Sequence, residues 1–269
     1  MKTWNQLKPS ETFRLRQTAG LSSQFLIAMH THPLKYPTFP ALEMADADGL
    51  LMLGGELSPV WILEAYRQGI FPWPLALDGV DLLAWFSPDP RAIFELDQLH
   101  ISRRLRRRLR NGGYEVTTNR AFERVMASCA APREDELGTW ITPDLATAYR
   151  QLHELGYAHS VEVWHREELV GGLYGVAIGG FFSGESMYHR QRDASKIAIC
   201  HLVRHLDQQG FTLFDIQQSS LHCSMMGASE IGRDDYLQRL RKATEQDVSF
   251  GEMNCKVSET FFREESLTG

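Results

Sequence analysis

The stretch Phe211-Thr212-Leu213-Phe214-Asp215-Ile216-Gln217 predicts a mostly apolar β-strand with two polar side chains near its end. Because side chains alternate along a strand, Asp215 and Gln217 face the same side, with their Cα atoms about 7 Å apart. A buried carboxylate costs several kcal/mol unless it is paired or hydrogen-bonded, so packing alone does not explain this strand. A solvated strand end, or a cap for the next helix, is the simpler interpretation of the same two residues.

Length and composition favour a globular protein of the cytoplasm. The 269 residues fit one large or two modest domains, and a hydrophobic content of 43% suffices for a core. No run approaches the ~18 apolar residues of a membrane span, and the N-terminus lacks the features of a secretory signal. The four cysteines show no zinc spacing, and the chain has neither a P-loop nor a GxGxxG motif. We therefore expect reduced thiols, no metal site, no cofactor and no membrane contact.

A dense cluster of positive charge contrasts with the net charge of −6. Eight consecutive residues contain six arginines: Arg103, Arg104, Arg106, Arg107, Arg108 and Arg110. Ile101, Leu105 and Leu109 recur at helical spacing, which predicts a helix over residues 101–110 with Ser102 as its cap. A solvated charged face is one interpretation of this helix. We favour phosphate binding, because an acidic protein that concentrates its positive charge usually has an anionic partner.

The first third of the chain predicts a small N-terminal domain over residues 1–87, with an irregular extension over residues 1–38. A serine cap followed by proline, and a closing glycine, predict a helix over residues 59–68. Two segments rich in aromatic residues and prolines predict loops, because proline does not continue regular structure: residues 69–73 and 85–91. Their aromatic side chains must be buried against another part of the chain.

The remaining residues, 88–269, alternate between strand and helix patterns. Two strands form a hairpin, and a third strand and the Asp215 strand follow: residues 159–164, 169–177, 181–187 and 211–217. Helices are expected at residues 120–130, 143–154, 193–209, 221–226 and 234–243. Antiparallel strands, a helix and a returning strand predict an α+β domain with one mixed sheet.

Glu185 is a third candidate for chemistry, within Ser183-Gly184-Glu185-Ser186-Met187. Strict alternation puts Phe182 and Glu185 on opposite faces of the strand, whereas a bulge at Gly184 would let both line one pocket. A surface position on the strand is the simpler interpretation of Glu185. The following turn, residues 190–196, leads into the N-terminus of a helix, where free backbone N–H groups favour anions.

Taken together, these segments resemble the leucyl/phenylalanyl-tRNA–protein transferase family. The resemblance extends from Phe39 to Leu240, through Ser87-Pro88-Asp89-Pro90-Arg91, Gly138-Thr139-Trp140-Ile141-Thr142, Gly184-Glu185-Ser186-Met187, Ala194-Ser195-Lys196, the Asp215 strand and residues 49–59, 65–73, 159–164 and 169–175. Glu56, Phe86, Tyr188-His189 and Met225-Met226 depart mildly from the family's usual residues. The resemblance implies a large domain similar to acetyltransferases of the GNAT type, preceded by a smaller N-terminal domain.

The resemblance also implies a reaction. Leu or Phe, and less well Met, would pass from its tRNA ester to the α-amino group of a protein with N-terminal Arg or Lys, marking that protein for N-degron (N-end rule) degradation. No nucleotide or metal is needed, because the ester is already activated. Asp215 would polarise Gln217, which contacts the attacking amine, and Glu185 would hold that amine or the donor ester. As alternatives, Asp215 is a general base or binds the cationic side chain of the acceptor.

Substrate binding then needs an apolar pocket and a surface for RNA. Our candidates for the pocket are Leu173, Phe182, Met187 and Trp140. Trp73 and Trp140 would stack on the terminal adenosine, although core packing explains both tryptophans equally simply. The acceptor stem would be held through its phosphates by Arg103, Arg104, Arg106, Arg107 and Arg108.

We expect the protein to be a monomer, and two other functions compete with this one. An acetyltransferase that uses acyl-coenzyme A would need a glycine-rich pyrophosphate turn, whereas residues 190–196 contain no glycine. A non-catalytic RNA-binding module would bind tRNA and leave the aminoacyl ester intact. The expected partners are therefore aminoacyl-tRNA and acceptor proteins with N-terminal Arg or Lys.

Overall fold

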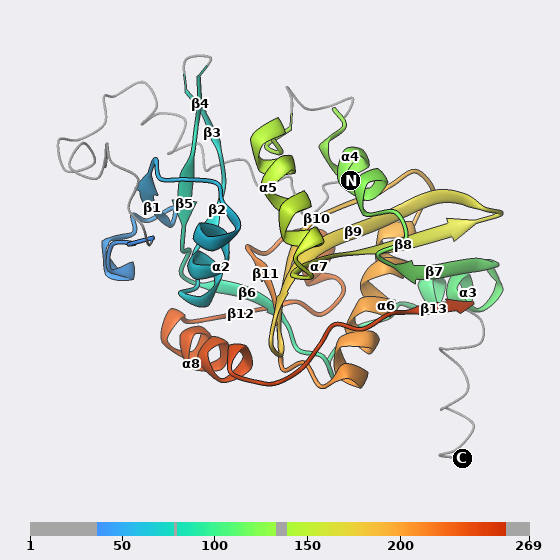
Figure 1. Ribbon diagram of the computed structural model, residues 1–269. Helices are drawn as coiled ribbons and strands as arrows, with labels where there is room; N and C mark the ends of the chain where they lie inside the picture. The colour runs from blue at the N-terminus through green and yellow to red at the C-terminus, as the bar shows by residue number, and fades with distance from the viewer. Residues whose placement is uncertain (1–36, 78–79, 133–138, 257–269) are drawn as a thin grey trace.

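The computed structural model describes residues 37–77, 80–132 and 139–256, and an eight-stranded mixed sheet is its central feature (Figure 1). The strand order is β12-β6-β11-β10-β9-β8-β7-β13. In that order the strands are Ser229–Ile231, Arg91–Phe94, Leu213–Gln217, Phe181–His189, Glu168–Ile178, Ala158–His165, Tyr114–Thr118 and Asn254–Lys256. Within this sheet β10 and β11 run parallel, and the other neighbouring strands are antiparallel.

The parallel pair exists because a long helix connects its two strands. Helix α6 (Ala194–Gln209) crosses over between β10 and β11, as parallel neighbours require. It ends at Gly210, whose φ of 86° lies in the left-handed region that glycine adopts at no steric cost. The crossover turns an antiparallel meander into a mixed sheet, so the predicted α+β class with one mixed sheet is confirmed.

Helices cover both faces of the sheet and divide the core in two (Figure 1). Helices α4 (Phe122–Ala130) and α5 (Pro143–Glu154) pack on one face, together with α2 (Pro59–Arg67) and α8 (Arg233–Thr244). Helices α6 and α3 (Arg103–Asn111) pack on the other. Phe181 and Phe182 show the division, because these neighbours belong to different core clusters. We refer to the two sides as the α5 face and the α6 face.

A three-stranded sheet lies beside the α5 face, in the order β1-β5-β2. Its strands are Leu50–Leu53, Ala84–Phe86 and Phe71–Pro72, and a hairpin of β3 (Leu75–Leu77) and β4 (Val80–Leu82) extends from it. The prediction of loops at residues 69–73 and 85–91 is therefore wrong in part. Pro72 fits a strand because β2 is at the edge of its sheet, where a missing N–H costs no ladder bond.

The helices that capping and spacing predict are present within a few residues of the expected bounds. Ser102 and Thr142 accept hydrogen bonds from the third residue of α3 and α5, at 3.3 and 3.2 Å. A 3₁₀ turn, η3 (Leu42–Met44), and α7 (Leu221–Ser224) complete the described elements. No helix in the described ranges is long and apolar enough to cross a membrane. The predicted extension over residues 1–38 lies almost wholly outside the described residues.

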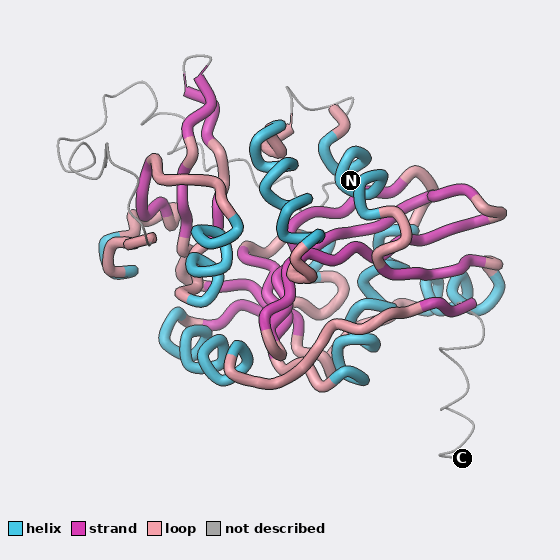
Figure 2. Tube along the Cα trace, viewed as in Figure 1, coloured by secondary structure: helices cyan, strands magenta, loops and turns pink. Residues whose placement is uncertain are grey.

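The segment after α8 returns along the α6 face as an extended loop (Figure 2). Phe250 in this loop stacks on Phe182, with ring centroids 5.4 Å apart, and also contacts His205 of α6. Strand β13 then pairs with β7 at the far edge of the large sheet. The loop therefore completes the packing of the α6-face core, together with the sheet and α6.

Candidate functional site

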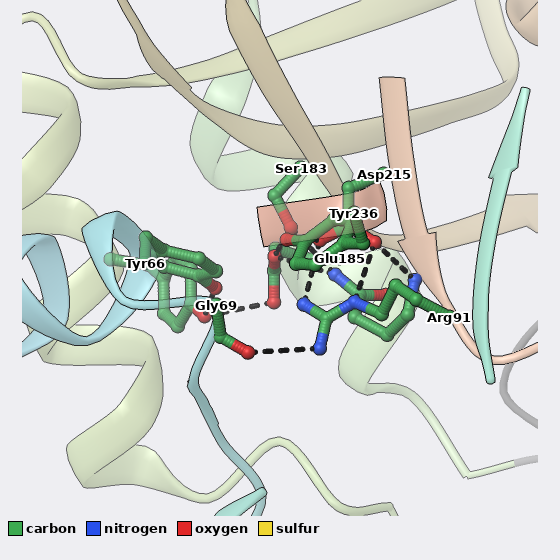
Figure 3. Close-up of polar contacts among 9 residues, drawn as sticks. Tyr66, Gly69, Arg91, Ser183, Glu185, Asp215 and Tyr236 are labelled. Atoms are coloured by element: carbon green, nitrogen blue, oxygen red, sulfur yellow. Dashed lines mark hydrogen bonds and ion pairs between the residues drawn. The ribbon is translucent and has the colours of Figure 1, made fainter. Parts of the chain in front are cut away.

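Asp215, at the centre of β11, forms a fully buried ion pair with Arg91 of β6 (Figure 3). Arg91 donates from Nε to Oδ1 at 2.9 Å and from Nη2 to Oδ2 at 2.7 Å. The hydroxyl of Tyr236 on α8 also donates to Oδ2, at 2.8 Å. Both charged side chains are 0% exposed, so the Asp215 carboxylate has no contact with solvent.

Arg91 links the small sheet to the large one. Its Nη1 donates to the backbone carbonyl of Gly69 at 3.0 Å, and its guanidinium carbon lies over the rings of Phe71 and Tyr236, 4.9 and 4.6 Å from their centroids. A planar, weakly hydrated guanidinium suits such a site, because it pairs with a carboxylate through two parallel bonds while its faces contact aromatic rings. The nearby Asp215 charge raises the pKa of Arg91, although burial opposes this shift.

Gln217 faces the same side as Asp215, as alternation predicts, but the two side chains do not contact each other. Its backbone N–H donates to Asp215 Oδ1 at 2.8 Å, across a bulge between these two residues. Its φ of 58° is in the left-handed region. The side-chain Nε2 donates to Ser183 Oγ at 2.7 Å and to Glu185 Oε1 at 3.2 Å. The amide of Gln217 is therefore directed at Glu185.

Glu185 lies at the bulge in β10 and accepts hydrogen bonds on both oxygens. Ser183 Oγ donates to Oε1 at 3.0 Å, and the Tyr149 hydroxyl donates to Oε2 at 2.9 Å. The Tyr149 hydroxyl is 2.6 Å from that of Tyr66, which links α5 to α2. Burial raises the pKa of Glu185 to about 7, and hydrogen bonds from the surrounding hydroxyls oppose that shift. Glu185 can therefore exchange a proton near neutral pH.

The structure brings Leu173, Phe182 and Met187 together, but on the α6 face. All three are 0% exposed. Phe182 packs edge-on against Phe214 and stacks on Phe250. The expected bulge exists, between Gly184 and Ser186, yet it does not bring Phe182 to the Glu185 side. The reason is its position: an extra residue at Glu185 reverses the alternation after that point, so Met187 joins Phe182 instead.

Trp73 and Trp140 stack on each other, with ring centroids 4.9 Å apart and planes inclined by 14°. Both are half-buried and pack against the core cluster of the α5 face, which also contains Tyr66 and Tyr149. The buried Nε1 of Trp140 has no hydrogen-bond partner in the described part of the chain. The two tryptophans thus share a face with Glu185, as a joint role with it would require.

Helix α3 presents most of its arginines to one hollow of about 790 Å³. Its lining is Arg103, Arg104, Arg107, Arg108, Asn111, Gly112 and Tyr114. Arg106, a predicted phosphate ligand, does not belong to that lining. Arg108 contacts the turn before α6, through an ion pair with Asp193 at 3.3 Å and a hydrogen bond to the Arg192 carbonyl at 3.0 Å. Helix α3 lies near β7 and β13 at one edge of the sheet, away from β11, the strand that contains Asp215 (Figure 1).

Sequence reasoning missed four residues of the buried cluster: Tyr66, Arg91, Tyr149 and Tyr236. Arg91 begins the apolar strand Arg91-Ala92-Ile93-Phe94, and a charge at the head of such a strand was a detectable signal. The three tyrosines occupy core positions of helices, where nothing in the spacing separates a packing residue from a hydrogen-bond donor. Within the described ranges, no three His, Cys, Asp or Glu residues are grouped so that they could hold a metal ion.

Comparisons with known proteins agree on one family. The family model described as leucyl/phenylalanyl-tRNA protein transferase matches residues 93–241, and the model of the corresponding N-terminal domain matches residues 55–89. Two relatives of that name are 52% identical over 206 residues (Syntrophotalea carbinolica; 76% of this chain, 88% of the relative) and 49% identical over 222 residues (Aromatoleum aromaticum; 82% and 92%). A third, from Alkalilimnicola ehrlichii, is 52% identical over 208 residues, covering 76% of this chain and 80% of the relative. The chain therefore belongs to the leucyl/phenylalanyl-tRNA–protein transferase family of aminoacyltransferases.

Proposed function

We propose that this enzyme transfers Leu or Phe, and less well Met, from aminoacyl-tRNA to the α-amino group of proteins with N-terminal Arg or Lys. The new N-terminal residue would mark the acceptor for N-degron degradation. Family membership supports the reaction class. The observation that carries the chemistry is the buried Glu185 carboxylate, whose pKa is raised by burial to about 7 and whose Oε1 accepts from the Gln217 amide.

The attacking amine needs a proton acceptor. An α-amino group has a pKa near 8, so much of it is protonated at neutral pH and cannot attack the ester. Glu185 has the matching proton affinity, and it and Gln217 are slightly exposed, at 5% and 7%, whereas Asp215 is 0% exposed. As the amine nitrogen bonds to the ester carbon, Glu185 takes a proton from it. The bond from that carbon to the ribose oxygen then breaks, and Glu185 returns the proton it accepted to the leaving oxygen.

Asp215 is better suited to positioning than to proton transfer. Its Oδ1 accepts from Arg91 and from the Gln217 N–H, and its Oδ2 accepts from Arg91 and Tyr236. A carboxylate with four donors and no exposed surface has no free direction for an amine. We therefore assign the proton acceptor to Glu185 rather than to Asp215, and we assign no contact between Asp215 and the acceptor.

We propose that Leu173, Phe182 and Met187 select the donor side chain. These residues are 0% exposed on the α6 face, whereas Glu185 lies on the α5 face, so their packing would have to open toward the bulge at Glu185 when the donor binds. Their shared cluster supports this role, and an unbranched methionine side chain adapts its shape to a ligand. One methylene in such a pocket discriminates by only ~1–3 kcal/mol, so selection against other apolar residues is incomplete. On the α5 face, Trp73 and Trp140 would contact the terminal adenosine, and the buried Trp140 N–H, which has no partner among the described residues, would become a donor to it if the site opened.

The arginine helix would hold the acceptor stem. Phosphate oxygens accept from arginine without regard to base sequence, so recognition of tRNA there is largely sequence-blind. The hollow between α3 and Tyr114 supports this assignment, because four arginines converge on it. An exposed groove of that charge concentrates an anionic partner before the donor end reaches Glu185.

Several broader features belong to the same proposal. The parallel β10–α6–β11 crossover supports a GNAT-like large domain. The separate small sheet supports a division into an N-terminal domain over residues 1–87 and a catalytic domain over residues 88–269. Aminoacyl-tRNA as donor supports a cytoplasmic location. We also propose that the protein acts as a monomer.

Transfer of labelled Leu from Leu-tRNA to a protein with N-terminal Arg tests the proposal. We expect label in the acceptor, a rate that rises as the pH passes through about 7, and no transfer when the acceptor amine is acetylated. Matched acceptors with N-terminal Lys and Gly measure acceptor selectivity. Hydrolysis of the ester without label in any acceptor would contradict the proposed reaction.

A further inference from the structure

We infer that Arg91 and Tyr236 are positioning residues for the transfer reaction: acting through Asp215, they hold Gln217 in the conformation that directs its amide at Glu185. Neither residue is within hydrogen-bond reach of Glu185 in the contacts described above. Their effect passes through one carboxylate and one backbone N–H. The inference rests on the proposed function, and the experiments below separate the two.

The backbone of Gln217 has an unusual conformation. A non-glycine residue rarely adopts a φ of 58°, and such a conformation persists only where its surroundings impose it. Here the Gln217 N–H donates to Asp215 Oδ1 at 2.8 Å, within the bulge that separates β11 from the regular ladder of β6. The carboxylate of Asp215 thus replaces the ladder partner that the bulge removes.

Asp215 is itself fixed in place. Arg91 holds both oxygens in a two-bond pair, and Tyr236 donates a further bond from α8. Arg91 is in turn fixed by the Gly69 carbonyl and by the two aromatic rings that it lies over. Three separate parts of the chain therefore determine the orientation of one carboxylate (Figure 3).

Gln217 connects this orientation to the reacting group. Ser183 is the register partner of Asp215 in the parallel pair of strands, which places Ser183 and Glu185 beside the end of β11. The Gln217 amide therefore donates to both Ser183 Oγ and Glu185 Oε1. If the Gln217 backbone relaxed to an ordinary strand conformation, the amide would leave Oε1. Glu185 would then keep its bonds to Ser183 and Tyr149 but lose the donor that fixes its plane.

The variant Tyr236→Phe tests the inference with a minimal change. It keeps the ring on the Arg91 guanidinium and removes only the hydroxyl that bonds Asp215. Loss of this hydrogen bond to a charged group should lower kcat by about tenfold. KM for Leu-tRNA should change by less than about twofold. In a Gln217→Ala background the same change should lower kcat by less than about twofold, because the group through which Tyr236 acts is absent.

A second Tyr→Phe variant provides the matched comparison through the pH dependence of kcat. The titratable groups that face Glu185 are Tyr66 of α2, Tyr149 of α5, Tyr174 of β9 and Asp215 of β11. Tyr149→Phe removes a hydrogen bond that lowers the pKa of Glu185, so the inflection should move to higher pH. Tyr236→Phe should lower the plateau and leave the inflection in place. Tyr157→Phe, away from the cluster, should change neither.

The outcomes are distinct. Wild-type kcat in Tyr236→Phe, or an equal loss in the Gln217→Ala background, would overturn the inference while leaving the transfer reaction intact. A wild-type enzyme that transfers no Leu would instead overturn the proposed function. If Tyr236→Phe does not fold, Arg91→Lys replaces it: the charge stays, the two-bond pair is lost, and kcat should again fall only where Gln217 is present.

Discussion

The buried cluster around Glu185 and the arginine helix α3 use charge in opposite ways. In the buried cluster, Arg91 and Asp215 are 0% exposed and face each other, so each charge has a fixed partner. On α3, two leucines are buried on one side of the helix, and four of the arginines line an open hollow. The first arrangement depends on the position of single atoms, and the second depends on the sum of many charges. A single substitution should therefore be severe in the cluster and mild on the helix.

The largest expected effect is on stability, from Arg91→Ala. Removal of one partner leaves the Asp215 charge buried without compensation, which should lower the free energy of unfolding by about 3–5 kcal/mol. Urea denaturation measures the loss. Arg150→Ala is the control, because Arg150 pairs with Glu123 at the surface, with side chains 46% and 56% exposed, and should cost at most about 1 kcal/mol. Equal losses in the two variants would remove the distinction between buried and exposed charge.

Glu185→Gln should have the largest effect on catalysis. The change keeps the shape of the side chain and removes its basicity, so kcat should fall by about 10²–10⁴-fold with little change in KM for Leu-tRNA. Steady-state kinetics at saturating acceptor measure both values. Glu162→Gln is a close control: Glu162 is also buried in the large sheet, on β8, with hydrogen bonds from Ser160 and Thr117. A similar fall in kcat for Glu162→Gln would show that any buried glutamate of this sheet supports activity.

The same glutamate should make stability depend on pH. Burial raises the pKa of Glu185 to about 7, well above the ~4.3 of an unfolded chain, so folding favours its neutral form. The stability of the wild type relative to Glu185→Gln is therefore fully retained below about pH 4 and declines as the pH rises to about 7. The total decline should be about 4 kcal/mol. Denaturation of both proteins from pH 4 to 8 measures it, and a constant difference would place the pKa near its ordinary value.

The smallest effects should come from single changes on α3. Changing Arg103, Arg106 and Arg107 together to Glu should raise KM for tRNA and flatten its salt dependence by about one unit of log–log slope per lost phosphate contact. The kcat at saturating tRNA should stay near that of the wild type. Arg107→Glu alone should raise KM for tRNA more than Arg106→Glu does, because of these two residues only Arg107 lines the hollow. An unaltered salt slope in the triple variant would reassign α3 to a plain solvated surface.

The correct predictions from the sequence depend on local patterns. The two leucines of α3 and the threonine cap of α5 depend on neighbours three or four positions away, and both helices lie where the spacing predicts. The strand that carries Asp215 and Gln217, and its place after a crossover helix, are equally local. The loop prediction at residues 69–73 and 85–91 was wrong in part because an edge strand tolerates proline, and edges are a property of the whole sheet.

By itself, the sequence determined the helices and four strands of the large sheet, the mixed α+β class, the arginine helix and the polar residues of the Asp215 strand. Only the tertiary structure decided which carboxylate is held in an ion pair and which is not. Arg91 lies 124 positions before Asp215 and forms an ion pair with it, whereas burial raises the pKa of Glu185 to about 7 against the opposing hydrogen bonds of tyrosines from α2 and α5. The physical reason is that spacing describes neighbours along one element, while burial and charge pairing arise where distant elements meet.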